Sequence, residues 1–170
     1  MNPEIFSTKR LELRPITLMD IPSYEKYFID YEVIRFLSKN VPWPYPKNGI
    51  QIFLEEFIFP NLGKDRWFWG ICLKSNPNEI IGAIDLWRQG VPEHRGFWLG
   101  GKYWGNGFMT EAIQPVNQFS FEQLGFNKLT FSNAKGNYAS RKVKKKTGAK
   151  FLKLMPAEFV DPIFTKTEIG

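Results

Sequence analysis

The chain has 170 residues, of which 43% are apolar and 24% charged, and its formal net charge is +6. This length predicts a single domain spanning residues 1–170, and the composition excludes a disordered, collagen-like or low-complexity chain. No apolar run approaches the roughly 18 residues of a membrane span. The N-terminal residues also lack the apolar region of a signal peptide, so we expect a cytoplasmic protein without a membrane partner.

Cysteine and histidine each occur once, which restricts the chemistry. Cys72 has no partner for an intrachain disulfide, and with only His94 beside it no Cys/His zinc site of ordinary ligand number can form. Cys72 lies in an apolar, strand-like run, which is typical of a buried thiol. The chain also lacks the G-x-S-x-G motif of serine hydrolases. We therefore expect no metal.

Charge is distributed unevenly along the chain. Residues 1–90 hold 11 basic and 11 acidic side chains, whereas residues 91–170 hold 12 basic and 6 acidic ones, so the net charge belongs to the second half. The densest block is Arg141–Lys150, with six basic residues in ten. Such a block suits a solvated helix face, a nucleic-acid patch or the site of a phosphorylated ligand.

Residues 1–65 combine one strand-like run with three helix-like ones. Alternating leucines and charges mark the strand, and apolar residues at helical spacing behind capping side chains mark the helices. In chain order we expect a strand over 10–14, a helix from Thr17 or Asp20 to Tyr27 or Phe28, a short helix over 32–37 and a helix from Asn48 to Phe59. Three prolines within Val41–Pro46 predict a stiff aromatic loop.

From Arg66 onward the apolar period changes to two, which is typical of strands. The sequence Ser75–Asn78 predicts a hairpin turn between the first two of them. In chain order we expect strands over 66–73, 79–87 and 95–99, a helix over 108–124, a strand over 129–132, a helix over 138–147, and closing strands over 151–154 and 163–169. This order predicts an α+β fold with a single mixed, mostly antiparallel sheet flanked by helices.

A glycine-rich stretch, Gly100–Gly107, joins the strand over 95–99 to the next helix. The free N–H groups and the dipole at a helix start attract an anion. The stretch departs from a Walker A motif because Tyr103 replaces the Ser or Thr that holds magnesium. It departs from the Rossmann motif because Thr110 stands where the third glycine is needed.

Six short motifs occur in a fixed order along the chain. They are T-x-R-L-x-L-R at 8–14, the acidic residue Asp20, I-I-G at 80–82, G-x-x-L at 96–99, Y-W-G-x-G-x-x-T-E-A at 103–112, and N-x-x-S-x-x-V-x-x-K-x-G at 137–148. Residues 102–107 also follow the coenzyme A turn pattern Q/R-x-x-G-x-G, with Lys102 at the first position. Together the motifs resemble the GNAT-type N-acetyltransferases, in particular the RimJ/RimL-like branch of ribosomal-protein alanine N-acetyltransferases. The likeness covers nearly the whole chain.

This resemblance implies an N-acetyltransferase with acetyl-CoA as co-substrate. Backbone amides of the turn would hold the pyrophosphate, the edge of the strand over 95–99 would pair with pantetheine, and the basic helix, including Lys142, would meet the 3′-phosphate. The residues expected to contact the cofactor are Leu99, Lys102, Tyr103, Trp104, Gly105, Asn106, Gly107, Phe108, Met109, Asn137, Ser140, Arg141 and Lys146. Coenzyme A carries a charge of about −4, which suits the basic second half.

The implied reaction is direct attack of an amine on the thioester, and it needs no covalent enzyme intermediate. Glu93 and His94, just before the strand over 95–99, are the expected general bases, with Asp85 as a third candidate. Backbone N–H groups near Leu99 and Gly100 are expected to polarise the acetyl oxygen.

The general acid is open at this point. Many members of the family place tyrosine at the position of Lys144, so the usual phenol is missing here. Ser140 or a bound water is the expected substitute. Because of this lysine, a second interpretation stays open: a family member that binds coenzyme A but has lost catalysis.

The acceptor is expected to be an amine, either a protein N-terminus or a small molecule. We expect it to lie against Trp43 and Tyr45 of the stiff loop, near Trp67, Trp69 and Trp87, since an aromatic wall favours apolar or cationic groups. A non-enzymatic RNA-binding module built on the lysine block is the remaining alternative. RNA-binding signatures are missing, so we do not expect a nucleic-acid partner. The sequence allows a monomer or a homodimer.

Overall fold

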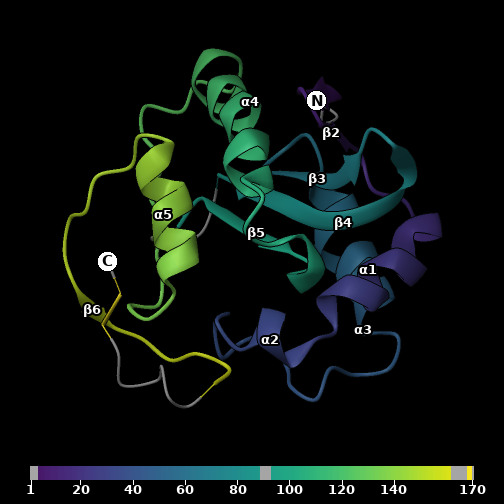
Figure 1. Ribbon diagram of the computed structural model, residues 1–170, viewed down its shortest axis with the longest axis horizontal. Helices are drawn as coiled ribbons and strands as arrows, with labels where there is room; N and C mark the ends of the chain where they lie inside the picture. Colours follow the sequence, from purple (N-terminus) through teal and green to yellow (C-terminus); the bar gives the residue numbers. More distant parts are fainter. Residues whose placement is uncertain (1–3, 89–92, 162–167, 170) are drawn as a thin grey trace.

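A five-stranded antiparallel sheet forms the centre of the molecule in the computed structural model, which describes residues 4–88, 93–161 and 168–169 (Figure 1). Its strands, in spatial order, are β1 (Phe6–Ser7), β2 (Leu11–Arg14), β3 (Arg66–Leu73), β4 (Asn76–Trp87) and β5 (Arg95–Leu99). A separate antiparallel pair is formed by β6 (Met155–Pro156) and β7 (Glu168–Ile169). The predicted α+β class with a mostly antiparallel sheet is confirmed.

The helices follow the predicted order. They are η1 (Leu18–Asp20), α1 (Ile21–Phe28), α2 (Tyr31–Ile34), α3 (Gly49–Phe53), the π-helical turn η2 (Leu54–Ile58), η3 (Phe59–Asn61), η4 (Gly101–Tyr103), α4 (Phe108–Glu122) and α5 (Tyr138–Lys146). Thr17 caps the first of them, because its side chain accepts from the Met19 amide while the Asp20 carboxylate accepts from the Thr17 amide. Asn48 stands at the start of α3 but makes no side-chain cap, since its backbone is left-handed with φ 60°.

Alternation along β3 assigns the helices to the two faces of the sheet. Trp69 points to one face, where its ring centroid lies 5.9 Å from that of Phe119 in α4. Phe68 points to the other face and meets Phe53 of α3 at 6.3 Å. In Figure 1, α4 and α5 accordingly lie on one side of the sheet, and α1 and α3 on the other.

Three strand expectations are wrong. β4 begins at Asn76 rather than at residue 79, because register shifts around Cys72 let Leu73 pair directly with Asn76. Residues 129–132 are not a strand, so no described strand pairs in parallel. Residues 151–154 are exposed and without regular structure, and β6 begins only after them. Of the last expected strand, 162–167 lie outside the described residues.

The core fills both faces of β3 and β4. Cys72 is a fully buried free thiol, as predicted, and burial raises its pKa. Within the described parts of the chain, no helix is long and apolar enough to cross a bilayer.

Candidate active site

β5 has one edge that the sheet does not use. At its two ends the Trp87 amide donates to the His94 carbonyl and the Gly100 amide to the Ile81 carbonyl, both at 2.8 Å. Bonded and non-bonded pairs alternate along an antiparallel ladder. The amides of Phe97 and Leu99 therefore point away from β4, toward residues 129–133. The Gly100 amide is bound to β4, so the expectation that it polarises an acetyl oxygen is wrong.

Residues 129–133 meet β5 at one end only. The His94 amide donates to the Thr130 carbonyl at 2.9 Å, and the Thr130 amide donates to His94 Nδ1 at 3.0 Å. Farther along, no backbone hydrogen bond among the described residues joins Phe97 or Leu99 to this segment. Beyond Thr130 no backbone hydrogen bond among the described residues holds the two segments together, and the Phe97 and Leu99 amides face the space between them, which we call the opening.

The glycine turn follows directly after this edge. Gly105 and Gly107 adopt φ angles of +79° and +76°, a left-handed backbone that side chains disfavour. The Asn106 side-chain amide donates to two carbonyls of the turn, and the Trp104 indole donates to the Leu99 carbonyl at 2.7 Å. The turn is therefore held in shape by its own side chains, and α4 begins directly after Gly107.

Tyr103 fixes the turn to the sheet beneath it. Its hydroxyl lies 3.2 Å from that of Tyr27, which donates at 2.6 Å to Glu79 of β4. The hydrogen bond from Tyr27 lowers the pKa of Glu79. Lys102 is exposed beside Tyr103, whereas Met109 is buried in the first turn of α4. Among the predicted cofactor residues, Tyr103 and Met109 thus serve to position the turn.

A cation that is not among the predicted site residues lies beside the turn. Arg10 Nε pairs with Glu111 Oε1 at 2.8 Å, and the guanidinium lies 4.4 Å from the ring centroid of Phe108. A Cβ on Gly107 would lie 3.7 Å from Arg10 Nη2. Arg10 and Glu111 each belong to a quoted motif, but the motifs are far apart in sequence and no local pattern joins them.

Four of the predicted cofactor residues, Asn137, Ser140, Arg141 and Lys146, lie along α5 from its cap to its last residue. Asn137 caps the helix, with its side-chain oxygen accepting from the Ser140 amide at 3.3 Å. Arg141 and Lys146 are exposed, while Ser140 is half-buried. Their contact with a cofactor remains a prediction.

The two predicted bases differ in their surroundings. His94 Nδ1 accepts a backbone hydrogen bond, so the ring is neutral with its proton on Nε2, and burial lowers its pKa. It cannot take a proton without breaking the bond to Thr130, which favours a structural role. Burial raises the pKa of Glu93, and the positive charge of Lys144 partly opposes that effect. Glu93 therefore lies close enough to Lys144 for the two charges to interact.

Two basic side chains converge on the opening from the α4 and α5 face. Arg95 is only 3% exposed and donates from Nη1 to Asn117 of α4. Lys144 of α5 donates to the Ser132 carbonyl at 2.6 Å and to Asn133 Oδ1 at 3.1 Å. Its nitrogen lies 5.6 Å from the ring centroid of Phe97. The sequence singled out Lys144, whereas Arg95 was expected only as the first residue of its strand.

The aromatic wall is only partly as predicted. Trp67 and Trp69 are buried in the core, on the α4 face, so their assignment to an acceptor site is wrong. Trp43, Tyr45 and Trp87 stay partly exposed. Tyr45 packs on Phe28 of α1, with ring centroids 5.6 Å apart.

Asp85 lies on the same face as Trp87. Its carboxylate binds the Arg66 guanidinium through both oxygens, with Nε to Oδ1 at 2.9 Å. Burial raises the pKa of Asp85, and Arg66 opposes that effect. Gly96 lies opposite Asp85 in the ladder, and a Cβ there would meet the Trp87 ring at 3.5 Å.

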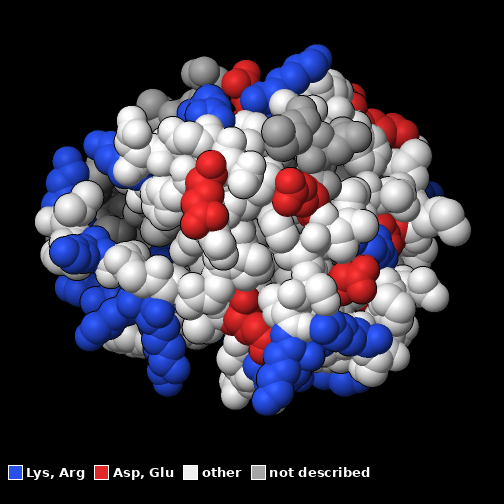
Figure 2. Space-filling model, turned by 90° about the horizontal axis from the view of Figure 1, so that it is seen from above, with Lys and Arg blue, Asp and Glu red and all other residues white. Residues whose placement is uncertain are grey.

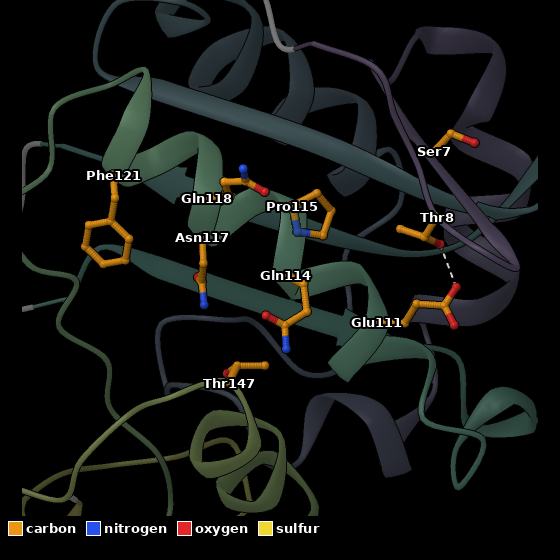
Figure 3. Close-up of a pocket in the computed structure, with 9 residues that line it drawn as sticks. All are labelled: Ser7, Thr8, Glu111, Gln114, Pro115, Asn117, Gln118, Phe121 and Thr147. Atoms are coloured by element: carbon orange, nitrogen blue, oxygen red, sulfur yellow. Dashed lines mark hydrogen bonds between the residues drawn. The ribbon is translucent and has the colours of Figure 1, made fainter.

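A groove of about 560 Å³ runs along α4, where Gln114 and Asn117 extend toward Thr147 at the end of α5 (Figure 3). It contains none of the predicted site residues, and its one acidic lining residue, Glu111, is paired with Arg10. This groove is therefore separate from the predicted site.

A larger groove of about 1150 Å³ lies between α5, residues 127–135 and residues 148–154. Its charged lining residues are all basic: Lys128, Lys135, Arg141, Lys142, Lys144, Lys145 and Lys150. Figure 2 shows Lys and Arg gathered at the end of the molecule that α5 occupies in Figure 1, with the acidic side chains farther to the right. The predicted charge asymmetry is thus concentrated beside the opening.

Similar folds occur among solved acetyltransferases. A ribosomal-protein alanine acetyltransferase from Vibrio fischeri superposes with a TM-score of 0.80 at 17% identity, over 98% of this chain and 93% of that chain. A RimL ribosomal alpha-N-protein acetyltransferase in complex with coenzyme A gives 0.79 at 15% identity, over 98% and 94%. An acetyltransferase from Agrobacterium tumefaciens gives 0.68 at 23% identity, over 99% and 94%. These likenesses confirm the predicted RimJ/RimL-like fold.

Comparison with curated protein sequences finds no match. Residues 10–150, by contrast, match the acetyltransferase (GNAT) domain family. The match supports neither a non-catalytic coenzyme A binder nor an RNA-binding module. Since it spans most of the chain and includes both the glycine turn and the cap of α5, the protein belongs to the GNAT acetyltransferase family and is an acetyl-CoA-dependent N-acetyltransferase.

Proposed function

We propose that this protein transfers the acetyl group of acetyl-CoA to the α-amino group of a protein N-terminus. The observation that carries the proposal is the unused edge of β5, which ends at a glycine turn opening a helix. An extended pantetheine chain pairs with such an edge as an added strand would. The turn then receives the pyrophosphate through its free N–H groups.

Arg10 adds a positive charge to this cradle. Its Nε donates to Glu111, and its Nη atoms make no hydrogen bond among the described residues. The guanidinium is 43% exposed and lies beside Gly107. We therefore assign it to a pyrophosphate oxygen, and Arg141 and Lys146 to the 3′-phosphate.

The acetyl oxygen would accept a hydrogen bond from the Leu99 amide, which points into the opening. The amine would approach from the α1 face, past Trp43, Tyr45 and Trp87. Attack on the thioester carbon forms the new C–N bond, and loss of the thiolate follows. No side-chain nucleophile takes part.

An α-amine suits a site without a strong free base. At pH 7 deprotonation of an α-amine costs about 1 kcal/mol, whereas that of a lysine side chain costs about 4.6 kcal/mol. Asp85 is tied to Arg66 and His94 to Thr130. Two of the similar structures support the same acceptor class, since their names describe acetylation of a ribosomal-protein alanine and of an alpha-amino group.

The test is a panel of acceptors with acetyl-CoA, recording free thiol. It compares peptides with a free N-terminus, the same peptides with a blocked N-terminus and an internal lysine, and small amines such as spermidine. We expect thiol release only with free N-terminal peptides. Release with the blocked peptides or the small amines would assign a different acceptor class.

A further inference from the structure

The opening beside β5 holds a buried cation with an incomplete set of partners. Arg95 Nη1 donates to Asn117, and the guanidinium lies 3.9 Å from the ring centroid of Phe131. Its Nε and Nη2 are buried without a hydrogen-bond partner. Burial of an incompletely partnered charge is costly, and here it lowers the pKa of Arg95 to about 9.

Lys144 brings a second positive charge to the same place. Its ammonium has three N–H donors, and two acceptors, the Ser132 carbonyl and Asn133 Oδ1, are in place. Its nitrogen lies near Phe97, whose backbone amide faces the opening. One donor therefore remains for a group that lies along the free edge of β5.

Among the described residues, Glu93 is the one carboxylate whose charge acts on Lys144. Glu93 is close enough for the charges of Glu93 and Lys144 to shift each other's pKa, but it forms no ion pair within 4 Å in the described structure. Burial and the charge of Arg95 lower the pKa of Lys144 to about 7, and Glu93 opposes this shift. One positive charge is left unbalanced, so an anion that forms in the opening is stabilised there.

The anion that the reaction forms at this edge is the thiolate of coenzyme A. We propose that the Lys144 ammonium protonates this thiolate as it leaves, and that Arg95 is a positioning residue that keeps Lys144 ready to donate. The proposal rests on the proposed function. A thiol has a pKa of about 8.5 and an ordinary lysine about 10.4, so an ordinary lysine would give up its proton uphill. The burial of Lys144 reverses that order.

The step balances without another reactant. The amine nitrogen bonds to the acetyl carbon, the C–S bond breaks, and sulfur leaves with the electron pair. Sulfur takes one proton from Lys144 Nζ, and the amine nitrogen releases one proton to solvent. Neutral Lys144 then recovers a proton from solvent, and the products are the amide and the free thiol.

The test measures acetyl-CoA affinity and the pH profile of kcat for the wild type, K144M, K144Y and R95M. K145M is the matched control, because Lys145 is the exposed neighbour in the same helix. We expect K144M to lose at least tenfold in kcat while its acetyl-CoA affinity changes less than threefold. K145M should match the wild type. The wild-type kcat should fall as the pH rises through about 7.

The remaining variants separate proton donation from packing. K144Y should recover part of the lost kcat and move the alkaline fall to higher pH, since a phenol keeps its proton to about pH 10. R95M, checked for folding by its melting curve, should also move the fall upward, because Lys144 then holds its proton more tightly.

Two results would overturn the inference: a K144M enzyme with wild-type kcat and pH profile, or one whose loss of kcat is matched by loss of acetyl-CoA affinity. If the wild type neither binds acetyl-CoA nor releases thiol with any amine, the proposed function fails instead. Binding by all variants together with an unchanged profile refutes only the role of Lys144.

Discussion

The Thr8 hydroxyl donates a 2.5 Å hydrogen bond to Glu111 Oε2, which joins residues 103 positions apart. The same carboxylate accepts from the Arg10 amide at 2.9 Å and pairs with Arg10 Nε. These bonds lower the pKa of Glu111. The first turn of α4 is thereby fixed to the start of β2, and with it the glycine turn.

Glu111→Gln should lower the free energy of unfolding by about 1 kcal/mol. Arg10 is half exposed, so the lost ion pair itself contributes little, and most of the change comes from the Thr8 and Arg10 donors that lose a charged acceptor. Urea denaturation measures the difference. Glu122→Gln is the control, because in the described part of the chain the Glu122 carboxylate accepts its one hydrogen bond from Gln118 of the same helix. Equal behaviour of the two variants would contradict the anchoring role.

Gly105→Ala should weaken acetyl-CoA binding at least tenfold. A Cβ at Gly105 meets no protein atom within 4 Å, so it is free to project toward the ligand. Gly125→Ala is a matched control, with φ +71° and equally open surroundings at the end of α4. Both variants should lose about 1 kcal/mol of stability from the left-handed backbone. Calorimetric titration should show weakened binding for Gly105→Ala alone. Equal affinities of the two variants would mean that the pyrophosphate does not bind at this turn.

Arg10→Gln should weaken binding of both coenzyme A and dephospho-coenzyme A about tenfold, as loss of one charge-assisted hydrogen bond would. Pantetheine, which lacks the pyrophosphate, should bind the variant and the wild type equally. Arg141→Gln should affect only coenzyme A, because only that ligand carries the 3′-phosphate. A loss for pantetheine as well would mean that Arg10 acts through folding of the turn.

Lys144→Met should remove part of the pH dependence of the free energy of unfolding. The pKa of Lys144 is about 7 in the folded protein and about 10.4 when unfolded. Between these values the unfolded chain holds a proton that the folded one lacks, so the free energy of unfolding rises with pH. Denaturation of the wild type minus that of Lys144→Met should show this rise between pH 7 and 10. If the difference in free energy of unfolding stayed constant over this range, the pKa of Lys144 would not be lowered in the folded protein.

Local patterns predicted the elements that depend on neighbours in sequence. The leucine alternation placed β2, the Thr17 and Asp20 pair placed the start of α1, and the glycines placed the turn before α4. Asn137 was singled out as a cofactor residue, and in the structure it caps α5. Such features are decided within a few residues, so the sequence expresses them directly.

Other features depend on packing that no local pattern records. Alternation showed that Trp67 and Trp69 share a face of β3, but not that α4 would bury that face. Residues 129–132 have strand-like composition, yet among the described residues their one backbone bond to this part of the sheet joins Thr130 to His94, just before β5. The Thr8–Glu111 contact and the burial of Arg95 likewise join distant parts of the chain. Each of these features is apparent only in the folded structure.

A crystal structure of the protein with acetyl-CoA is the most direct measurement. The pyrophosphate oxygens should accept hydrogen bonds from the amides between Gly105 and Met109, and pantetheine should pair with the Phe97 and Leu99 edge. The sulfur should lie within hydrogen-bonding reach of Lys144 Nζ. A cofactor that leaves the glycine turn empty, or a thioester on the far side of β5 from Lys144, would contradict this assignment.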